Sequence, residues 1–361
     1  MAALRRVWDA GDAVLPVDQR LSEKARSALL NSLAPAAVID SSGRTALPGA
    51  RAVEAGDALV MSTSGTTGSP KGVVLTHSAV EASARATSAR LGVDPDRHRW
   101  LACLPLNHVG GLSVLTRSLC TGTACTVLPG FDEEAVRHAS WPDVLVSLVA
   151  TALQRTPADL FHTVVLGGST PPAGLADNVV TTYGLTETGS GVVYDGVPLE
   201  GVEVQLTPGS DEVRLRCPML LRCYRDGSVP LDGDGWFYTG DVGRLDADGR
   251  LQIAGRMTDM IISGGENIWP GPVEDLLRLH PGVAEVAVAG RPDPEWGQRV
   301  VAWVVPSDPT EPPTLEDLRD LVGDRLARFA APRQLVLTRS LPRTSIGKVR
   351  RERLEVPPGD S

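Results

Sequence analysis

The sequence predicts an α/β protein in which a layered sheet is followed by smaller mixed units, and three observations support this. Apolar segments that suit buried strands alternate with segments of helical periodicity between residues 101 and 184. Between residues 201 and 256 the predicted strands are short and separated by turn residues. A compact α+β pattern begins at residue 257. Strands that alternate with helices are typical of a largely parallel sheet covered by helices.

The elements of the first part follow from the spacing of apolar residues. Helices are predicted over 21–33 and 78–92, and a buried strand over 57–65 lies between them. The alternating elements are a strand at 101–106, a helix at 110–119, a strand at 123–130, a helix at 132–138 and strands at 143–150, 163–168 and 178–184.

A small β unit and a second domain complete the predicted architecture. The β unit has strands at 201–206 and 212–217 and a hairpin over 235–256, whose turn contains Asp248 and Gly249. The second domain has helices at 272–280 and 314–329 and strands at 283–290 and 299–305. We expect domains 1–256 and 257–361, which are both ordinary domain sizes.

The composition limits the classes of function. With 42% hydrophobic and 22% charged residues, the 361-residue chain is typical of a soluble globular protein. A net charge of -9 disfavours nucleic acid and anionic membranes as partners. The longest apolar run, 144–153, is too short for a membrane span, and Asp9 and Asp12 interrupt any signal peptide, so we expect a cytoplasmic protein. Five cysteines without a C-x-x-C pair indicate reduced thiols.

The segment MSTSGTTGSPKG, residues 61–72, is rich in groups that bind phosphate. It is not a Walker loop, because Pro70 precedes Lys71 and Gly72 follows it. Its backbone N–H groups and hydroxyls can surround phosphate oxygens, and Lys71 adds a positive charge. The alternative is a flexible Gly/Ser linker. The strand before the loop and the stiffness of Pro70 favour phosphate binding.

Two later segments carry groups that suit a nucleotide and a metal ion. In TTYGLTETGSG, residues 181–191, Tyr183 can cover a purine, and Glu187 is a single carboxylate of the kind that binds Mg²⁺ beside phosphates. In YTGDVG, residues 238–243, Asp241 can accept hydrogen bonds from ribose hydroxyls. Taken singly, each segment could instead be an ordinary polar turn.

Two segments near the C-terminus complete the set, GRMTDMIISGGENIWPGPVE at 255–274 and LPRTSIGKVRR at 341–351. Lys348 lies in the second, where most lysines are merely solvated. In their order along the chain and in their residues, the five segments closely resemble the motifs of the superfamily of adenylate-forming enzymes. This superfamily includes acyl-CoA ligases, nonribosomal adenylation domains and firefly luciferase. The resemblance extends over nearly the whole chain from Leu59 onward.

The resemblance implies a large N-terminal adenylation domain with layered α/β sheets and a small β unit, followed by a small mobile α+β C-terminal domain. It implies Mg²⁺ as a cofactor and ATP and coenzyme A as co-substrates. By position, the ATP-binding residues would be Thr63, Ser64, Gly65, Thr66, Thr67, Gly68 and Lys71 for the phosphates, Tyr183 and Gly184 for adenine, Thr186 for the α-phosphate, Glu187 for magnesium, and Asp241 and Arg256 for the ribose.

The same resemblance implies two half-reactions. Lys348 would bridge the substrate carboxylate and the α-phosphate and stabilise the charge of adenylation. The C-terminal domain would then rotate about a hinge at Thr258. That rotation would remove Lys348 and bring Ser263, Gly264 and Gly265 to the path of the CoA thiol.

The segment LPLNHVGGLSVLTRSLCTG, residues 104–122, bears on the substrate. His108 matches the residue that lines the acyl pocket in CoA ligases, and no aspartate for an α-amino group is present. Arg117 is our candidate to bind a second carboxylate, and the alternative of equal weight is a solvated helix arginine. Gly167, Gly168 and Ser169 would line the pocket near the adenine and acyl groups.

Among CoA ligases, the chain is most similar to the o-succinylbenzoate-CoA ligases of menaquinone biosynthesis in their short actinobacterial form. The matching segments include YGLTETGSGVVYDGVPLEGV, ISGGENIWP and RTSIGK. The stretch before the phosphate loop is shorter than in most of the superfamily, and Asn107 replaces a common aromatic residue. Another aryl- or acyl-CoA ligase, an adenylation enzyme that loads a carrier protein, and a non-catalytic binding protein are the alternatives. A homodimer is left open.

Overall fold

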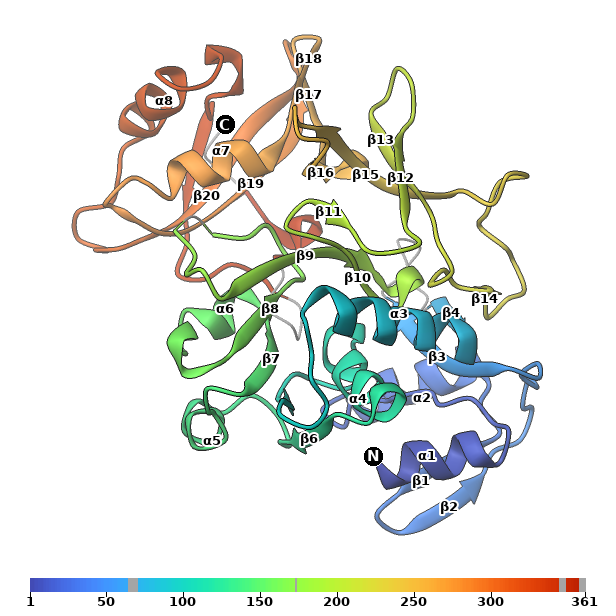
Figure 1. Cartoon of the computed structure of the whole chain (residues 1–361). Helices are drawn as coiled ribbons and strands as arrows, with labels where there is room; N and C mark the ends of the chain where they lie inside the picture. The colour runs from blue at the N-terminus through green and yellow to red at the C-terminus, as the bar shows by residue number, and fades with distance from the viewer. Residues whose placement is uncertain (64–70, 173, 344–348, 357–361) are drawn as a thin grey trace. The chain divides into compact units, whose positions relative to one another are not determined.

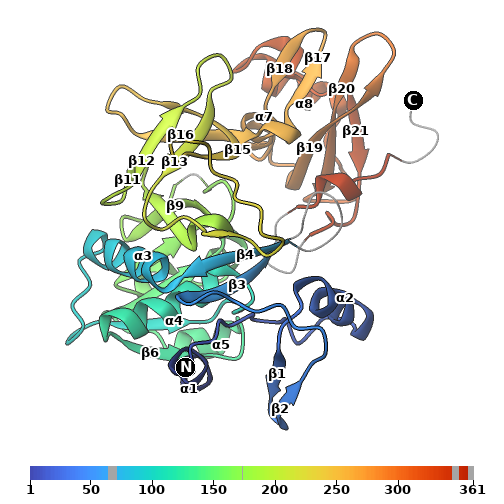
Figure 2. The same cartoon turned by 90° about the vertical axis from the view of Figure 1, so that its right-hand side faces the viewer.

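The computed structural model describes residues 1–63, 71–172, 174–343 and 349–356. The chain forms two compact units, of which the first comprises Met1–Val204 and Arg214–Tyr238 (Figures 1 and 2). The second comprises Gln205–Val213 and the chain from Thr239 onward. This division differs from a boundary at 256/257, because residues 239–256 belong to the second unit. The boundary at 256/257 is expected from the α+β pattern that begins at residue 257, and both this boundary and a movement about Thr258 stay predictions.

A seven-stranded sheet forms the centre of the first unit, in the order β11-β10-β9-β8-β7-β5-β6. The pairs from β9 to β6 are parallel, and β10 and β11 extend the sheet with antiparallel pairs. The predicted, largely parallel sheet is therefore confirmed. Its strands are β5 (Arg99–Ala102), β6 (Ala124–Val127), β7 (Val144–Leu148), β8 (Thr163–Leu166), β9 (Val179–Leu185), β10 (Ser190–Tyr194) and β11 (Val197–Pro198).

Helical segments connect most of the parallel strands. They are α4 (Val109–Thr121) between β5 and β6, α5 (Glu133–His138) between β6 and β7, and α6 (Ala150–Leu153) with the 3-10 turn η1 (Ala158–Leu160) between β7 and β8. Leu101, Val146 and Val164 of the sheet pack against Val136 of α5 and Phe161, and all five side chains are buried. Burial of this apolar surface is the main force that holds the layers together.

A separate antiparallel sheet holds the two ends of the Gly-rich loop. It consists of β3 (Asp57–Thr63), β4 (Lys71–Thr76) and β14 (Cys223–Tyr224), with β4 in the middle. The sequence predicts β3 but not β4. Helix α3 (His77–Arg90) follows β4 directly, because the Thr76 hydroxyl accepts the N–H of Ala79 and caps the helix. Helices α3 and α4 lie beside this sheet (Figure 2).

The chain before β3 contributes four further elements, α1 (Ala2–Asp9), α2 (Glu23–Leu33), β1 (Ala37–Asp40) and β2 (Gly43–Ala46). Only α2 is predicted from the sequence. The indole N–H of Trp8 donates to the carbonyl of Ala58, at 2.9 Å, and Val14 forms a parallel bridge with Leu59. The N-terminal segment is therefore attached to β3.

A four-stranded sheet contains the predicted β unit. Its strands are β12 (Glu203–Leu206), β13 (Glu212–Arg216), β15 (Phe237–Leu245) and β16 (Leu251–Arg256), in that order. The chain passes from one compact unit to the other within β12, β13 and β15. β15 and β16 form the predicted hairpin, and Gly249 adopts a φ of 74° in its turn, a conformation that favours glycine.

A five-stranded sheet forms the rest of the second unit. It contains β17 (Ile261–Ser263), β18 (Glu266–Ile268), β19 (Val283–Asp293), β20 (Gly297–Pro306) and β21 (Gln334–Leu337). Helices α7 (Pro270–Leu277) and α8 (Leu315–Gly323) contribute to the buried core on this sheet (Figure 1). The predicted helix over 314–329 is wrong at its C-terminal end. Gly323, a poor helix former, ends α8, and the turn η4 (Arg328–Ala330) follows.

Two short 3-10 turns, η3 (Met257–Asp259) and η5 (Arg351–Arg353), complete the second unit. Within the part of the chain that the structure describes, no helix is long and apolar enough to cross a bilayer.

Candidate active site

The ends of the predicted phosphate loop are brought together by strand pairing. Thr63 is the partner of Lys71 in the β3–β4 hairpin, so the intervening segment starts and ends at one place. Ser64, Gly65, Thr66, Thr67 and Gly68, which we expect to bind phosphate, lie outside the described residues.

The motif with Thr186 and Glu187 forms the 3-10 turn η2 (Thr186–Thr188) between β9 and β10. The Thr188 hydroxyl donates to the carbonyl of Ser190, at 2.7 Å, and fixes the end of the turn. A Cβ on Gly184 would lie 2.2 Å from that same carbonyl oxygen, so the close approach of the two strands requires glycine there. The turn that carries Glu187 is therefore held tightly in place.

Tyr224 of β14 connects the loop end to this turn. Its hydroxyl donates to Oε1 of Glu187, at 3.1 Å, and Nζ of Lys71 lies 5.1 Å from the centre of its ring. A cation at this distance from an aromatic face is attracted to it. Lys71 and Glu187 thus share one aromatic partner. No sequence motif indicates Tyr224, which lies in an otherwise unremarked stretch.

The Glu187 carboxylate is a suitable ligand for magnesium. Among the residues that the structure describes, no group of three or more His, Cys, Asp or Glu side chains could hold a metal by itself. Mg²⁺ is commonly bound through one or two carboxylates and completes its shell with phosphate oxygens and water. A single carboxylate beside a phosphate loop fits that mode.

The residues expected around the adenine and the acyl group lie on neighbouring parallel strands. Gly167, Gly168 and Ser169 directly follow β8, and Tyr183 is on β9, which pairs with β8. A Cβ on Gly167 would lie 2.7 Å from the hydroxyl oxygen of Thr182, which shows how closely the two segments approach. The carboxyl ends of parallel strands are where open α/β sheets bind ligands.

His108 stands at the N-terminal cap of α4 and is partly buried. Burial lowers the pKa of its imidazole, the Asp18 carboxylate acts in the opposite direction, and Arg20 lowers it further. Asp18 and Arg20 form an ion pair, with Nη2 and Oδ2 2.8 Å apart. The sequence gives no signal for these two neighbours of His108, which lie 90 and 88 residues away along the chain.

Arg117 is buried, with 2% of its surface exposed, so a solvated helix arginine is excluded. Its Nη2 donates to Oγ of Ser190, at 2.5 Å, and Nη1 to Oγ of Ser147, at 3.4 Å. The guanidinium lies 5.1 Å from the ring centre of Trp100. Burial lowers the pKa of the Arg117 guanidinium. No Asp or Glu among the described residues pairs with it, and its Nε has no hydrogen-bond partner among them.

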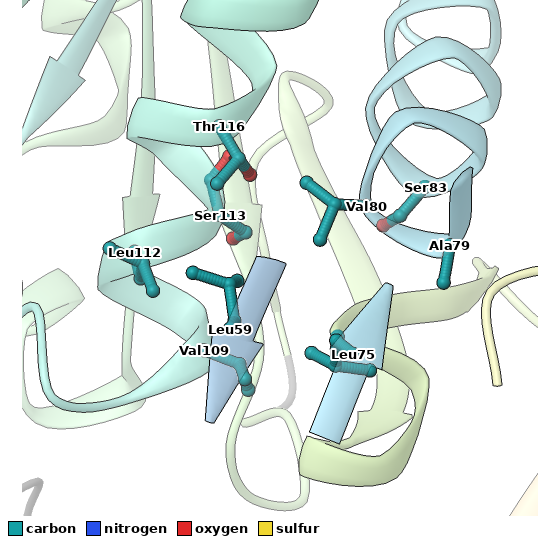
Figure 3. Close-up of a pocket in the computed structure, with 10 residues that line it drawn as sticks. Leu59, Leu75, Ala79, Val80, Ser83, Val109, Leu112, Ser113 and Thr116 are labelled. Carbon is teal, nitrogen blue, oxygen red and sulfur yellow. The ribbon is translucent and has the colours of Figure 1, made fainter. Parts of the chain in front are cut away.

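A small cavity lies between α3, α4 and the β3–β4 pair (Figure 3). Its volume of about 10 Å³ is room for about one water molecule. The Ser113 hydroxyl, on this cavity, is buried and has no partner among the described residues. The cavity is too small for a substrate and is part of the core. Its lining residues are Leu59, Leu75, Ala79, Val80, Ser83, Val109, Leu112, Ser113, Thr116 and Gly189.

In the second unit, the two residues expected at the ribose are cross-strand partners. Asp241 of β15 faces Arg256 of β16, and Oδ1 and Nε are 2.8 Å apart. The Asp241 side chain is 9% exposed and that of Arg256 42%. Arg256 also donates to the carbonyl of Thr239, at 3.1 Å. The pair presents an acceptor and a donor side by side, which is the chemistry that two vicinal hydroxyls require.

The remaining expected residues of this unit lie near its first strands. Thr258 is in η3, and Ser263, Gly264 and Gly265 lie at the turn between β17 and β18. Gly264 has a φ of 61°, and a Cβ there would lie 2.8 Å from the ring of Trp296, so glycine is required. Lys348 lies outside the described residues.

Comparison with known proteins shows the family of this chain. The family model described as AMP-binding enzyme matches residues 48–215, and the model described as AMP-binding enzyme C-terminal domain matches 272–348. A protein of Mycobacterium tuberculosis named as a probable 2-succinylbenzoate-CoA ligase is 40% identical over 323 residues, which cover 82% of this chain and 83% of that protein.

Two solved structures of o-succinylbenzoate CoA synthetase (MenE) from Bacillus subtilis are similar as well. The complex with the acyl-adenylate intermediate OSB-AMP has a TM-score of 0.78 and 29% identity and covers 98% of this chain and 80% of that one. The complex with ATP and magnesium ion has a TM-score of 0.76 and 28% identity, with coverage of 98% and 81%. The chain therefore belongs to the AMP-binding enzymes, in the group of AMP-forming acid-CoA ligases that includes the 2-succinylbenzoate-CoA ligases.

Proposed function

We propose that this chain activates an aromatic dicarboxylic acid, with 2-succinylbenzoate as the first candidate, in two steps. A substrate carboxylate oxygen attacks the α-phosphorus of ATP, and pyrophosphate leaves with the bridging oxygen. The CoA thiol then attacks the acyl carbon of the adenylate and displaces AMP. The names of the mycobacterial relative and of the Bacillus subtilis structures support this choice.

The proposed substrate class rests on the environment of Arg117. A buried guanidinium without a carboxylate partner among the described residues is costly to desolvate, and charged groups with strongly shifted pKa values cluster at functional sites. A carboxylate of the bound substrate would supply the missing partner, since charge-assisted bonds to guanidinium are among the strongest that proteins form. Arg117 donates a hydrogen bond to Ser190, which follows the turn with Thr186 and Glu187, so the guanidinium lies near the predicted nucleotide motif.

In the first half-reaction, the residues of this chain bind and orient the reactants and stabilise charge. Lys71 and the loop before it hold the β- and γ-phosphates, Thr186 contacts the α-phosphate and Tyr183 covers the adenine. Bound magnesium, held by Glu187, would neutralise phosphate charge. Lys348 stabilises the charge at the α-phosphorus. Asp241 and Arg256 bind the ribose hydroxyls.

In the second half-reaction, the carboxylate has become an electrophile with AMP as its leaving group. A turn about Thr258 withdraws Lys348 and brings Ser263, Gly264 and Gly265 to the thiol path. His108 lines the acyl side of that path. Its lowered pKa favours a neutral imidazole, which suits an apolar acyl pocket. Exclusion of water protects the adenylate from hydrolysis.

The co-substrates ATP and CoA are consistent with a cytoplasmic location, which remains part of the proposal. A homodimer stays a prediction, to be checked by the mass of the protein in solution.

The test is a mass-spectrometric search for CoA thioesters after incubation with ATP, Mg²⁺, CoA and a panel of acids. The panel contains 2-succinylbenzoate, other aryl dicarboxylates, aryl monocarboxylates and fatty acids. A dominant 2-succinylbenzoyl thioester supports the proposal. Thioesters of other acids alone would contradict the substrate, and acyl-adenylates without thioester would indicate a carrier protein as acceptor.

A further inference from the structure

The chain that follows Lys348 is attached to the second unit at several points. Val349 forms an antiparallel bridge with Arg343, and the N–H of Arg350 donates to the carbonyl of Pro342, at 2.8 Å. Further along, Leu354 is buried, and the indole N–H of Trp303 donates to the carbonyl of Glu355, at 2.8 Å. Residues 349–355 are therefore part of the packed unit.

Within this stretch, Arg351 contacts three separate elements. Its Nε donates to the carbonyl of Val288 on β19, at 3.1 Å. Nη1 lies 3.4 Å from Oδ2 of Asp259 in η3, and Nη2 lies 2.5 Å from Oε1 of Glu274 on α7. One planar guanidinium thus joins β19, η3 and α7. A guanidinium has donors in a fixed fork, whereas an ammonium is a single point of charge on a flexible stem.

The two acidic contacts of Arg351 differ in what they do for the fold. The Glu274 side chain is only 8% exposed, and its Oε1 also accepts the N–H of Val288, at 2.8 Å. A buried carboxylate requires a cation and hydrogen bonds, so this contact supports folding. The Asp259 side chain is 31% exposed and does not need a partner for burial. Its contact joins Arg351 to the residue directly after Thr258.

We propose that Arg351 is a positioning residue for adenylation, which ties the chain next to Lys348 to the turn at the hinge. The proposal rests on the proposed function, because it uses the roles assigned there to Lys348 and Thr258. The guanidinium is held by Asp259, β19 and α7, so the chain at 349–351 moves together with all three when the chain turns about Thr258. A group that stabilises transition-state charge tolerates little displacement, and a shift of about 1 Å can cost about 100-fold in rate.

The experiment measures the two half-reactions separately in the full-length chain. Adenylation is measured as the exchange of labelled pyrophosphate into ATP that requires the carboxylic acid substrate. Thioester formation is measured separately, starting from supplied acyl-adenylate and CoA. We expect Arg351→Lys to lower kcat for adenylation by about 10- to 100-fold. Asp259→Asn, which leaves the contact with Glu274 intact, should lower it by a smaller factor. Neither change should alter the thioester step or the KM for ATP.

Two control variants accompany these changes. Asp259→Glu keeps a carboxylate at the turn and should retain most of the adenylation activity. Arg278→Lys alters another arginine on the same Glu274, 3.4 Å from its Oε2, that does not contact η3, and it should leave both half-reactions unchanged.

The outcomes separate the inference from the proposed function. An equal loss in both half-reactions, together with a lower melting temperature, would mean that Arg351 only stabilises the fold. If Asp259→Asn slows only the thioester step, its effect is on the rotation of the C-terminal domain and not on the position of Lys348. Lys348→Ala is measured in parallel. If it abolishes adenylation while Arg351→Lys and Asp259→Asn have no effect, only this inference is overturned; if Lys348→Ala leaves adenylation intact, the proposed role of Lys348 fails first.

Discussion

Replacing Arg117 with methionine would show whether this buried cation serves the fold or the substrate. Its favourable interactions are a charge-assisted hydrogen bond to Ser190, worth about 1.5–3 kcal/mol, a longer and weaker one to Ser147, and a contact with Trp100 worth about 2 kcal/mol or less. Against them stands the desolvation of a charge that has no carboxylate partner in the described chain, which costs several kcal/mol. The opposing contributions nearly cancel. We therefore expect the free energy of unfolding to change by no more than about 2 kcal/mol in either direction.

Catalysis should respond far more than stability. Losing a charge-assisted bond to the second carboxylate should raise the KM for a dicarboxylate by about 10- to 100-fold. The KM for a monocarboxylate that the enzyme accepts should change by less than about 3-fold. Urea unfolding gives the stability, and steady-state thioester formation gives both KM values. Arg85→Met, at a side chain on α3 that is 67% exposed, is the matched control.

The reasoning is refuted if Arg117→Met destabilises the protein by more than about 3 kcal/mol while both KM values change equally, since the arginine would then be structural. Arg117→Ala should show the same difference between dicarboxylates and monocarboxylates, with an added cost for the cavity that it leaves.

Three further predictions follow from the same structure. Glu187→Gln should raise the Mg²⁺ concentration needed for half-maximal adenylation, and an unchanged magnesium profile would remove Glu187 from the metal site. Because the folded pKa of His108 lies below its ordinary value, protons bind the unfolded chain more readily, and the free energy of unfolding should fall as the pH drops below about 6.5. His108→Gln should reduce that slope between pH 7 and 5 in urea titrations, and identical slopes would contradict it. Burial raises the pKa of Cys103 to about 12 and those of Cys125 and Cys217 to about 11, so iodoacetamide at pH 7.5 should modify the folded protein much more slowly than the unfolded one, as measured by intact mass.

Local sequence patterns were sufficient for the class of fold and for most of the elements around the site. The segments 143–150 and 163–168 are largely apolar, as suits parallel strands buried on both faces, and β7 and β8 form there as expected. Some elements had no such pattern. The β1–β2 hairpin is almost entirely polar or exposed, and α8 ends at Gly323 although apolar residues at helical spacing continue beyond it.

The chemistry of the site divides in the same way. The residue types at Lys71, Glu187, Asp241 and Arg256, and their order along the chain, could be read directly, because a binding motif is a local run of donors and acceptors. The sequence predicts the hairpin over 235–256, but the structure decided that Asp241 pairs with Arg256, because the register of the hairpin shifts between Val242 and Gly243.

The sequence by itself determined the family, the order of the elements and the chemical groups available for catalysis. Only the tertiary structure decided which of these groups touch. Helix α4 is enclosed by α3 and by strands of the main sheet, so residues 111–118 are all buried and its periodicity could not show that Arg117 is inside. Tyr224 reaches Glu187 across 37 residues, and Arg351 reaches Asp259 across 92. Such contacts depend on how whole layers pack, and packing depends on residues far apart in the chain that no local pattern records.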